Sequence, residues 1–221
     1  MAAIKTIAII GATGNMGSAI AKSISKSRNY RLLLMSNEPE KLVALKKEVE
    51  KTAQHEEVFA LSCAKEASWE ADIIIVATPY ASEREVAEKI REVAIGKIVI
   101  SISNPLNHSF SELVTPPEIS AAEELQKLLP ASKVVKTFNT TFAANFNTPT
   151  IAGKTADAFI AGNNGDAVET VAGIVRDAGF NPIIAGDLSV SRTLERMQLM
   201  LIQLALKNNY NWLVGWKILH N

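Results

Sequence analysis

The residues with the clearest potential for chemistry are three glycines near the start of the chain, Gly11, Gly14 and Gly17, in the sequence GATGNMG. They follow an apolar run at 7–10, which is typical of a strand buried on both faces of a parallel sheet. A helical pattern begins directly after the third glycine. A turn without Cβ atoms at a helix N-terminus, where free N–H groups meet the positive end of the dipole, attracts phosphate oxygens. We therefore predict that this turn binds a nucleotide pyrophosphate.

A second group of polar residues, in the sequence SNEPEKL, follows the next predicted strand. In dinucleotide-binding folds this position meets the adenosine ribose, and an acidic residue there binds the 2′-hydroxyl of NAD. Here the position is Ser36, while Lys41 and the Thr13 hydroxyl could reach a 2′-phosphate. NADP is therefore favoured over NAD, although Glu38 counts against a phosphate. The alternative is that Ser36 only caps the helix starting near Pro39 and that Lys41 is solvated.

Small polar residues also follow three further predicted strands at the point where each strand ends. They are Thr78 with Pro79 and Tyr80 after the first strand, Asn104 after the second and Asn139 after the third. Residues just beyond the carboxyl ends of parallel strands face the ligand crevice. We therefore predict a crevice shaped by Thr78, Pro79, Asn104 and Asn139, with a nicotinamide beside Pro79. An alternative for Pro79 is that it only turns the chain into the following helix.

The elements that must position these residues alternate along the chain. Strands are expected at 7–10, 30–35, 58–62, 73–77, 97–101 and 133–138, and helical segments at 17–25, 39–54, 63–70, 83–93 and 120–129. This alternation predicts an α/β fold with a Rossmann-like, doubly wound parallel sheet.

A turn-rich stretch at 145–154, NFNTPTIAGK, is typical of a linker. We therefore expect a dinucleotide-binding Rossmann domain at 1–147 and a small C-terminal α/β domain at 148–221. In the second domain, strands at 158–161 and 180–184 should flank a helix at 167–178 capped by Asp166, which makes the GNNGDA loop structural. The domain ends in a long apolar helix at 189–206, which should be buried all round. Its methionine-rich stripe predicts a homodimer through this helix.

Composition excludes several other functions. Lys plus Arg and Asp plus Glu both total 23 without a basic cluster, which disfavours nucleic-acid binding. Cys63 is the single cysteine and the three histidines lack a metal-binding spacing, so we expect no disulfide within the chain and no metal site. No window approaches the ~20 apolar residues of a membrane span, and the start does not resemble a signal peptide. A cytoplasmic protein without a membrane or nucleic-acid partner is expected.

Seven motifs, in one order along almost the whole chain, resemble those of a known family. They are GATGNMG, SNEPEKL, ATPY, ISNP, KTFN, AGNNGDA and GDLSVSR. Together they are similar to the deazaflavin (coenzyme F420)-dependent NADP oxidoreductases, and equally to the cytoplasmic oxidoreductase domain of the STEAP metalloreductases. This resemblance implies NADPH as hydride donor and a flavin or deazaflavin as a small-molecule redox acceptor.

The resemblance also implies roles for single residues. Thr13, Asn15 and Met16 would lie at the pyrophosphate, Ser36 and Lys41 at the 2′-phosphate, Pro79 and Tyr80 beside the nicotinamide, and Asn139 near the acceptor. The full set of predicted cofactor-binding residues is Gly11, Thr13, Gly14, Asn15, Met16, Gly17, Ser36, Asn37, Lys41, Thr78, Pro79, Tyr80 and Asn104. The chain departs from the family at Asn37, where an arginine is usual, and at KTFNTTF, where the deazaflavin enzymes carry a histidine-containing motif.

The function predicted from these patterns is hydride transfer from NADPH to an acceptor ring held between the two domains. Such a transfer needs aligned approach and exclusion of water rather than a strong protein acid or base. This agrees with the absence of a catalytic pair, since no tyrosine has a lysine four residues later. The alternatives are an NADP-binding redox sensor, because GATGNMG also resembles the turn of the NmrA-like proteins, and a reductase of a small imine or carbonyl compound.

Overall fold

The molecule is built on one mixed sheet, described by a computed structural model for residues 4–53 and 57–220. Within those residues the large sheet contains β1 (Lys5–Ile10), β2 (Tyr30–Met35), β3 (Val58–Leu61), β4 (Ile73–Val76), β5 (Ile98–Ser101), β6 (Lys133–Lys136), β9 (Asp157–Gly162) and β10 (Asn181–Gly186). Their order across the sheet is β10-β9-β6-β5-β4-β1-β2-β3. The part from β3 to β6 has the strand order of a Rossmann fold.

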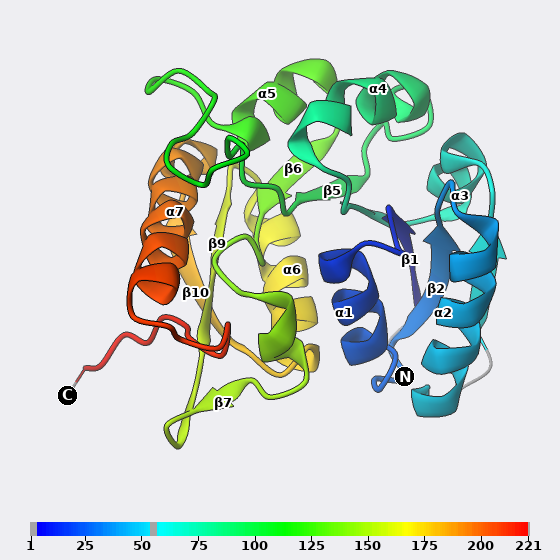
Figure 1. The fold of residues 1–221 in the computed structure, drawn as a ribbon. Coiled ribbons are helices and arrows are strands. Elements are labelled where there is room, and N and C mark those ends of the chain that lie inside the picture. Colours follow the sequence, from blue (N-terminus) through cyan, green and yellow to red (C-terminus); the bar gives the residue numbers. More distant parts are fainter. Residues whose placement is uncertain (1–3, 54–56, 221) are drawn as a thin grey trace.

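Helices cover both faces of this sheet (Figure 1). They are α1 (Asn15–Ile24), α2 (Pro39–Thr52), α3 (Ala64–Glu70), α4 (Tyr80–Ile90), α5 (Ala121–Leu128), α6 (Gly165–Asp177) and α7 (Ser191–Lys207). One apolar cluster joins α1, α2 and α6 to the sheet, whereas α3, α4, α5 and α7 pack against the opposite face. The predicted doubly wound α/β fold is confirmed.

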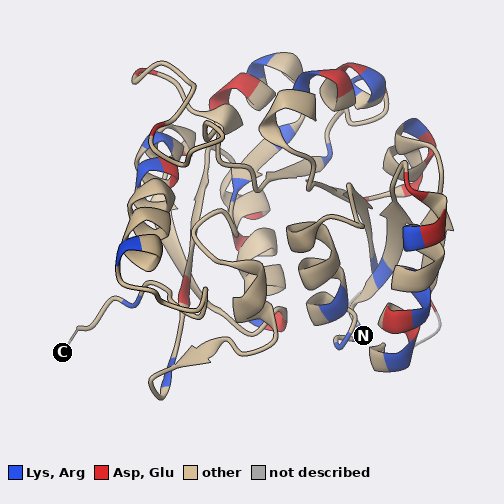
Figure 2. Cartoon of the chain, in the orientation of Figure 1, with Lys and Arg blue, Asp and Glu red and all other residues tan. Residues whose placement is uncertain are grey.

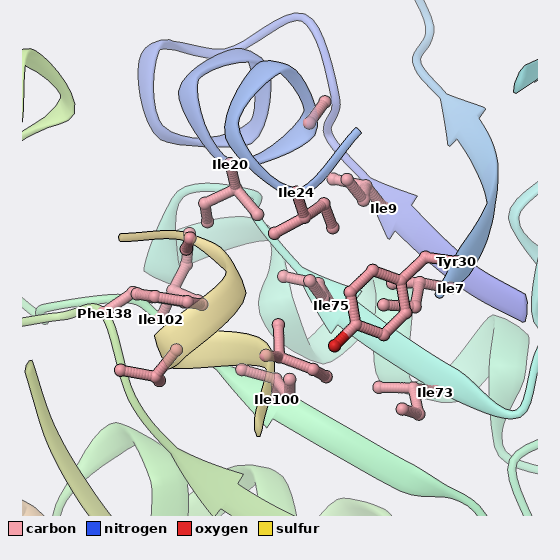
Figure 3. Packing of buried hydrophobic residues seen from close by; sticks show 14 of the residues in the cluster. Ile7, Ile9, Ile20, Ile24, Tyr30, Ile73, Ile75, Ile100, Ile102 and Phe138 are labelled. Carbon is pink, nitrogen blue, oxygen red and sulfur yellow. The ribbon is translucent and has the colours of Figure 1, made fainter. Parts of the chain in front are cut away.

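The two faces follow directly from the sequence of each strand. In β1, Ile7 and Ile9 belong to the cluster under α1, while Ala8 and Ile10 belong to the cluster on the other face. All four side chains are buried, because successive residues of a strand point to opposite faces. Figure 3 shows Ile20 of α1 and neighbouring apolar side chains packed over the strands. This packing fixes the start of α1 above the end of β1.

The sheet continues past the predicted domain boundary. Strand β9 pairs with β6 in antiparallel fashion through Val135 and Gly162, and β10 then pairs with β9 in parallel. The predicted linker contains the 3-10 helix η1 (Ala143–Phe146) and the short hairpin of β7 (Thr150–Ile151) and β8 (Lys154–Thr155). The division into domains at 1–147 and 148–221 stays a prediction.

Several helix boundaries differ from those expected. Helix α4 begins at Tyr80 rather than at 83, since Pro79 has a φ of −56° and leads straight into the helix. Helix α1 begins at Asn15 and includes the last glycine of the turn. The predicted end of α2 at 54 lies outside the described residues. Helix α6 is capped by Asn164, which accepts a hydrogen bond from Ala167, so the expected cap at Asp166 is wrong.

The prediction that the last helix is buried all round is also wrong. Helix α7 follows a short 3-10 helix, η2 (Leu188–Val190), and packs with one face on β9 and α5. That face buries Leu194 and Leu201, but Met200 and Leu204 are 47% and 40% exposed. Only one side of the helix has a neighbouring layer, so the opposite side meets solvent.

Charged residues are spread over the outer faces of the helices, with both signs interspersed (Figure 2). Among the described residues, no helix is long and apolar enough to cross a bilayer. The same residues contain no cluster of three or more histidine, cysteine or acidic side chains that could hold a metal ion.

Candidate nucleotide-binding cleft

A cleft of about 360 Å³ lies at the carboxyl ends of β1, β2 and β4. Its lining contains seven of the residues predicted to bind a cofactor, namely Gly11, Thr13, Gly14, Ser36, Asn37, Thr78 and Pro79. Asn15, Met16 and Gly17 continue from this lining as the first turn of α1. The structure therefore brings residues from three separate parts of the sequence to one edge of the sheet, as expected for parallel strands.

The three glycines of the turn lack a side chain for different physical reasons. At Gly11, where φ is +85°, an added Cβ would lie 2.7 Å from the Ala77 carbonyl oxygen, and at Gly17 it would lie 2.4 Å from the Gly11 oxygen. Both glycines are therefore required by packing. At Gly14 the nearest atom to an added Cβ is 3.4 Å away, so the fold itself accepts a side chain there. A missing side chain at Gly14 leaves the backbone open to a ligand.

Helix starts around the cleft lack side-chain caps, as does the start of α7. The N-cap residues of α1, α2, α3 and α4, which follow the strands that form this edge, make no cap hydrogen bond with their own side chains, although Ser36 Oγ accepts one from the N–H of Glu38, the N-cap of α2. By contrast, Ser120 and Asn164 cap α5 and α6 with their own side chains. Uncapped N-terminal N–H groups are available to an anion. This arrangement fits the pyrophosphate predicted at the start of α1.

The predicted ribose site forms a compact hydrogen-bonded group. The Thr13 Oγ1 lies 2.6 Å from the Ser36 Oγ and donates to Glu38 Oε2 at 3.1 Å. Lys41 forms an ion pair with the other oxygen of Glu38, and the hydrogen bond from Lys41 is the main cause that holds the pKa of Glu38 below its usual value. Thr13, Ser36 and Lys41 are thus brought together as predicted, but around an acidic side chain that faces the cleft.

The strand ends beyond the cleft are joined to one another. Asn104 donates to the Asn139 carbonyl oxygen at 2.9 Å, and the Asn139 amide donates to Asn104 Oδ1 at 3.0 Å. These two residues clamp the ends of β5 and β6 together and are not among the residues that line the cleft. Within the described residues, Thr78 Oγ1 and Asn139 Oδ1 are buried without a hydrogen-bond partner. Such orphaned acceptors and donors are typical of places completed by a ligand or water.

Tyr80 follows Pro79 in the chain, but it does not line the cleft. Its hydroxyl donates to Glu124 Oε2 at 2.5 Å, and it lines a smaller hollow between α4 and α5. Burial, followed by the hydrogen bond to Glu124, raises the pKa of Tyr80. A role for Tyr80 beside a nicotinamide stays a prediction.

One wall of the cleft was missed by the sequence analysis. Ser82, Glu85, Val86 and Lys89 of α4 all line it, and Glu85 pairs with Lys89 at 2.6 Å. Their spacing of three and four residues places them on a single helix face. The same spacing would have predicted this wall from the sequence if the helix had been expected to start at Tyr80.

A buried charged group near the strand ends was also missed. Lys136 of β6 is fully buried, forms an ion pair with Glu195 of α7 at 2.7 Å and donates to the Ser103 carbonyl oxygen at 2.5 Å. Glu83 of α4 lies in the same region, and its burial raises its pKa to about 7 against the opposing attraction of Lys136. This group connects α7 to the sheet and to α4.

Comparison with known proteins agrees with this architecture. Residues 6–105 match the family described as NADP oxidoreductase, coenzyme F420-dependent. An F420-dependent NADP reductase of Methanocaldococcus jannaschii is 29% identical over 212 residues, which cover 91% of this chain and 92% of that protein.

Solved structures show the same similarity. A putative F420-dependent NADP-reductase from Arthrobacter sp. FB24 superposes with a TM-score of 0.82 at 26% identity and covers 97% of this chain and 99% of that one. A pyrroline-5-carboxylate reductase from Coxiella burnetii shares the fold, with a TM-score of 0.65 and 16% identity, covering 93% of this chain and 70% of its own.

Taken with the sheet and the cleft, these similarities define the class of protein: the chain is an NAD(P)H-dependent oxidoreductase with a Rossmann fold. Within that class it resembles the coenzyme F420-dependent NADP oxidoreductases, as its motifs predict. The resemblance to the STEAP domains stays a prediction.

Proposed function

We propose that this protein transfers hydride between NADP(H) and a flavin or deazaflavin acceptor. The observation that carries the proposal is the cleft at the ends of β1, β2 and β4, where a glycine-rich turn, uncapped helix starts and the hydroxyls of Thr13 and Ser36 meet. The family description names NADP, and the relatives from M. jannaschii and Arthrobacter are named as F420-dependent reductases. These names favour a deazaflavin as the acceptor.

The residues present fit a bound NADP. The open backbone at Gly14 and the N–H groups at Asn15 and Met16 would hold the pyrophosphate. Asn37 follows Ser36 at the adenosine end, where Thr13, Ser36 and Lys41 would hold the 2′-phosphate.

At the other end of the cleft, Thr78 and Pro79 would form the wall behind the nicotinamide. Bound NADPH supplies the hydride. Asn104 and Asn139 fix the ends of β5 and β6 and so shape the floor on which an acceptor ring would rest.

The electrostatics of the cleft suit this reaction. Its acidic lining residues, Glu38 and Glu85, each have a pKa below the usual value, chiefly because of hydrogen bonds from Lys41 and Lys89. Neither carboxylate is poised to exchange a proton near neutral pH. Hydride transfer between two rings requires positioning and exclusion of water, and no such acid or base.

The test is anaerobic stopped-flow oxidation of NADPH at 340 nm with coenzyme F420, FMN or a quinone as acceptor. Oxidation with F420 or FMN supports the proposal. Tight NADPH binding without oxidation by any acceptor contradicts it and favours a redox sensor. A Gly14→Ala variant should fold normally and bind NADPH at least tenfold more weakly, because its methyl group occupies the space for the pyrophosphate.

We also propose a homodimer that buries the outer face of α7. Met200 and Leu204 are exposed on one face of this helix, and Leu213 and Leu219 are exposed in the C-terminal segment that follows it. Figure 1 shows this segment leaving the end of α7. Exposed apolar side chains that share a helix face are typical of interaction surfaces. Multi-angle light scattering at micromolar concentration tests the proposal, and a monomer contradicts it.

A cytoplasmic location is proposed as well, since Cys63 is free and exposed.

A further inference from the structure

The Glu38 carboxylate bonds to Thr13 and Lys41, two of the residues that would bind a 2′-phosphate. Thr13 donates to one of its carboxylate oxygens at 3.1 Å, and Lys41 pairs with the other. Ser36 bonds to Thr13 and accepts a hydrogen bond from the Glu38 backbone N–H at 3.1 Å. A carboxylate therefore stands where the proposed cofactor would place its phosphate oxygens.

We propose that Glu38 is a specificity-determining residue, which lowers the affinity for a 2′-phosphate by competing for Thr13 and Lys41. This inference rests on the proposed function, because it concerns how the same cleft distinguishes NADPH from NADH. A ribose 2′-hydroxyl carries no charge and can donate a hydrogen bond to the Glu38 carboxylate, so NADH leaves the ion pair between Glu38 and Lys41 intact. The 2′-phosphate must displace Glu38 from both partners.

The charges around the site strengthen the effect. Lys41 is already neutralised by Glu38, and across the cleft Lys89 is already neutralised by Glu85. Asn37 supplies no charge, although its side chain lines the cleft. A phosphate dianion thus approaches a site whose nearby positive charges are matched by carboxylates, and a like charge at hydrogen-bond range opposes it.

The displacement of Glu38 is nevertheless feasible. The side chains of Glu38 and Lys41 are 52% and 68% exposed, and exposed ion pairs contribute little to stability. Glu38 lies at the N-cap of α2, where no side-chain cap would be lost if it turned towards solvent. We therefore expect the carboxylate to tune affinity without blocking the cofactor.

The experiment is isothermal titration calorimetry of the full chain with 2′,5′-ADP and with 5′-ADP, which lacks the 2′-phosphate. The Glu38→Gln variant keeps the size of the side chain and the backbone N–H bond to Ser36. We expect it to bind 2′,5′-ADP about fivefold to tenfold more tightly, since the phosphate then meets no carboxylate and Lys41 is released from its ion pair. Its affinity for 5′-ADP should stay within about twofold.

The matched control is Glu40→Gln, which removes the same charge from the first turn of the same helix but lies outside the cleft lining. Its affinities for both nucleotides should remain those of the wild type. An unchanged or weaker affinity of Glu38→Gln for 2′,5′-ADP overturns the inference while leaving the proposed function standing. Failure of the wild type and both variants to bind either nucleotide overturns the proposed function and the inference together.

Discussion

Polar groups differ in burial between two regions of the molecule, the cleft and the contact of α7 with the sheet. At the cleft, α1, α2 and α4 begin without side-chain caps, and Lys41 pairs with Glu38 at the surface. Where α7 meets the sheet, the Lys136 and Glu195 side chains are buried together, and Glu195 also accepts a hydrogen bond from the Ala121 N–H at 3.2 Å. Helix starts at the cleft thus keep N–H groups available to a ligand and the charged pair there is exposed, whereas the charged pair beneath α7 is buried and holds elements of the fold together.

The largest expected effect comes from breaking the buried pair. Lys136→Met should lower the free energy of unfolding by about 3 to 5 kcal/mol, because it leaves the Glu195 carboxylate buried without its cation. Urea unfolding measured at pH 7 gives this value. The double variant Lys136→Met, Glu195→Gln should recover more than half of the loss. A change below about 1 kcal/mol in the single variant would show that the pair is not needed for the fold.

A smaller effect concerns Glu83, which is buried near Lys136, Glu195 and Glu124. Burial raises its pKa to about 7 from 4.5, so the folded protein binds the Glu83 proton more tightly than the unfolded chain does. The resulting stabilisation is complete below about pH 4.5 and is lost as pH rises through about 7. The stability of the wild type relative to Glu83→Gln should therefore fall by about 2 to 3 kcal/mol between pH 5 and pH 8.

Denaturant unfolding at several pH values measures this difference. Glu85→Gln serves as the control, since Glu85 is exposed on the same helix and its pKa is lowered by Lys89. A wild-type stability that stays constant relative to Glu83→Gln over this range would contradict the assignment of Glu83 to the buried group.

The smallest effect on stability is expected at the cleft. Lys41→Ala should change the free energy of unfolding by no more than about 0.5 kcal/mol, because the lysine is largely exposed. The same variant should bind 2′,5′-ADP more weakly and 5′-ADP unchanged, as calorimetry would show. A loss of stability above about 1 kcal/mol would mean that the cleft pair supports the fold, and would remove the contrast between the two regions.

The cleft was largely predictable from the sequence because its parts are local. An apolar run followed by Gly11 and Gly14 predicts a strand and a phosphate-binding turn within one short stretch, and β2 was predicted with its observed bounds, Tyr30–Met35. The position of Ser36 then follows from the end of that strand. Each step depends on residues that are neighbours in the chain.

The region beneath α7 was not predictable in the same way. Lys136 and Glu195 are 59 positions apart, and only the folded sheet brings them together. Within α7, Glu195 and Gln198 interrupt the apolar pattern, but nothing in the sequence shows that these polar side chains point inward. Burial of a charge depends on a partner that periodicity does not identify.

The direction of the strands has a consequence for how an anionic molecule would approach the protein. Helices α1, α2 and α4 begin at the same edge of the sheet, and the C-terminal ends of α1 and α6 lie side by side away from it, where Ser23 donates to the Ala178 carbonyl oxygen at 2.9 Å. The chain has no formal net charge, yet its helix dipoles are not evenly distributed. An approaching anion is therefore oriented by a local field at the cleft and receives no long-range attraction from the whole molecule, so that salt should slow its association only weakly.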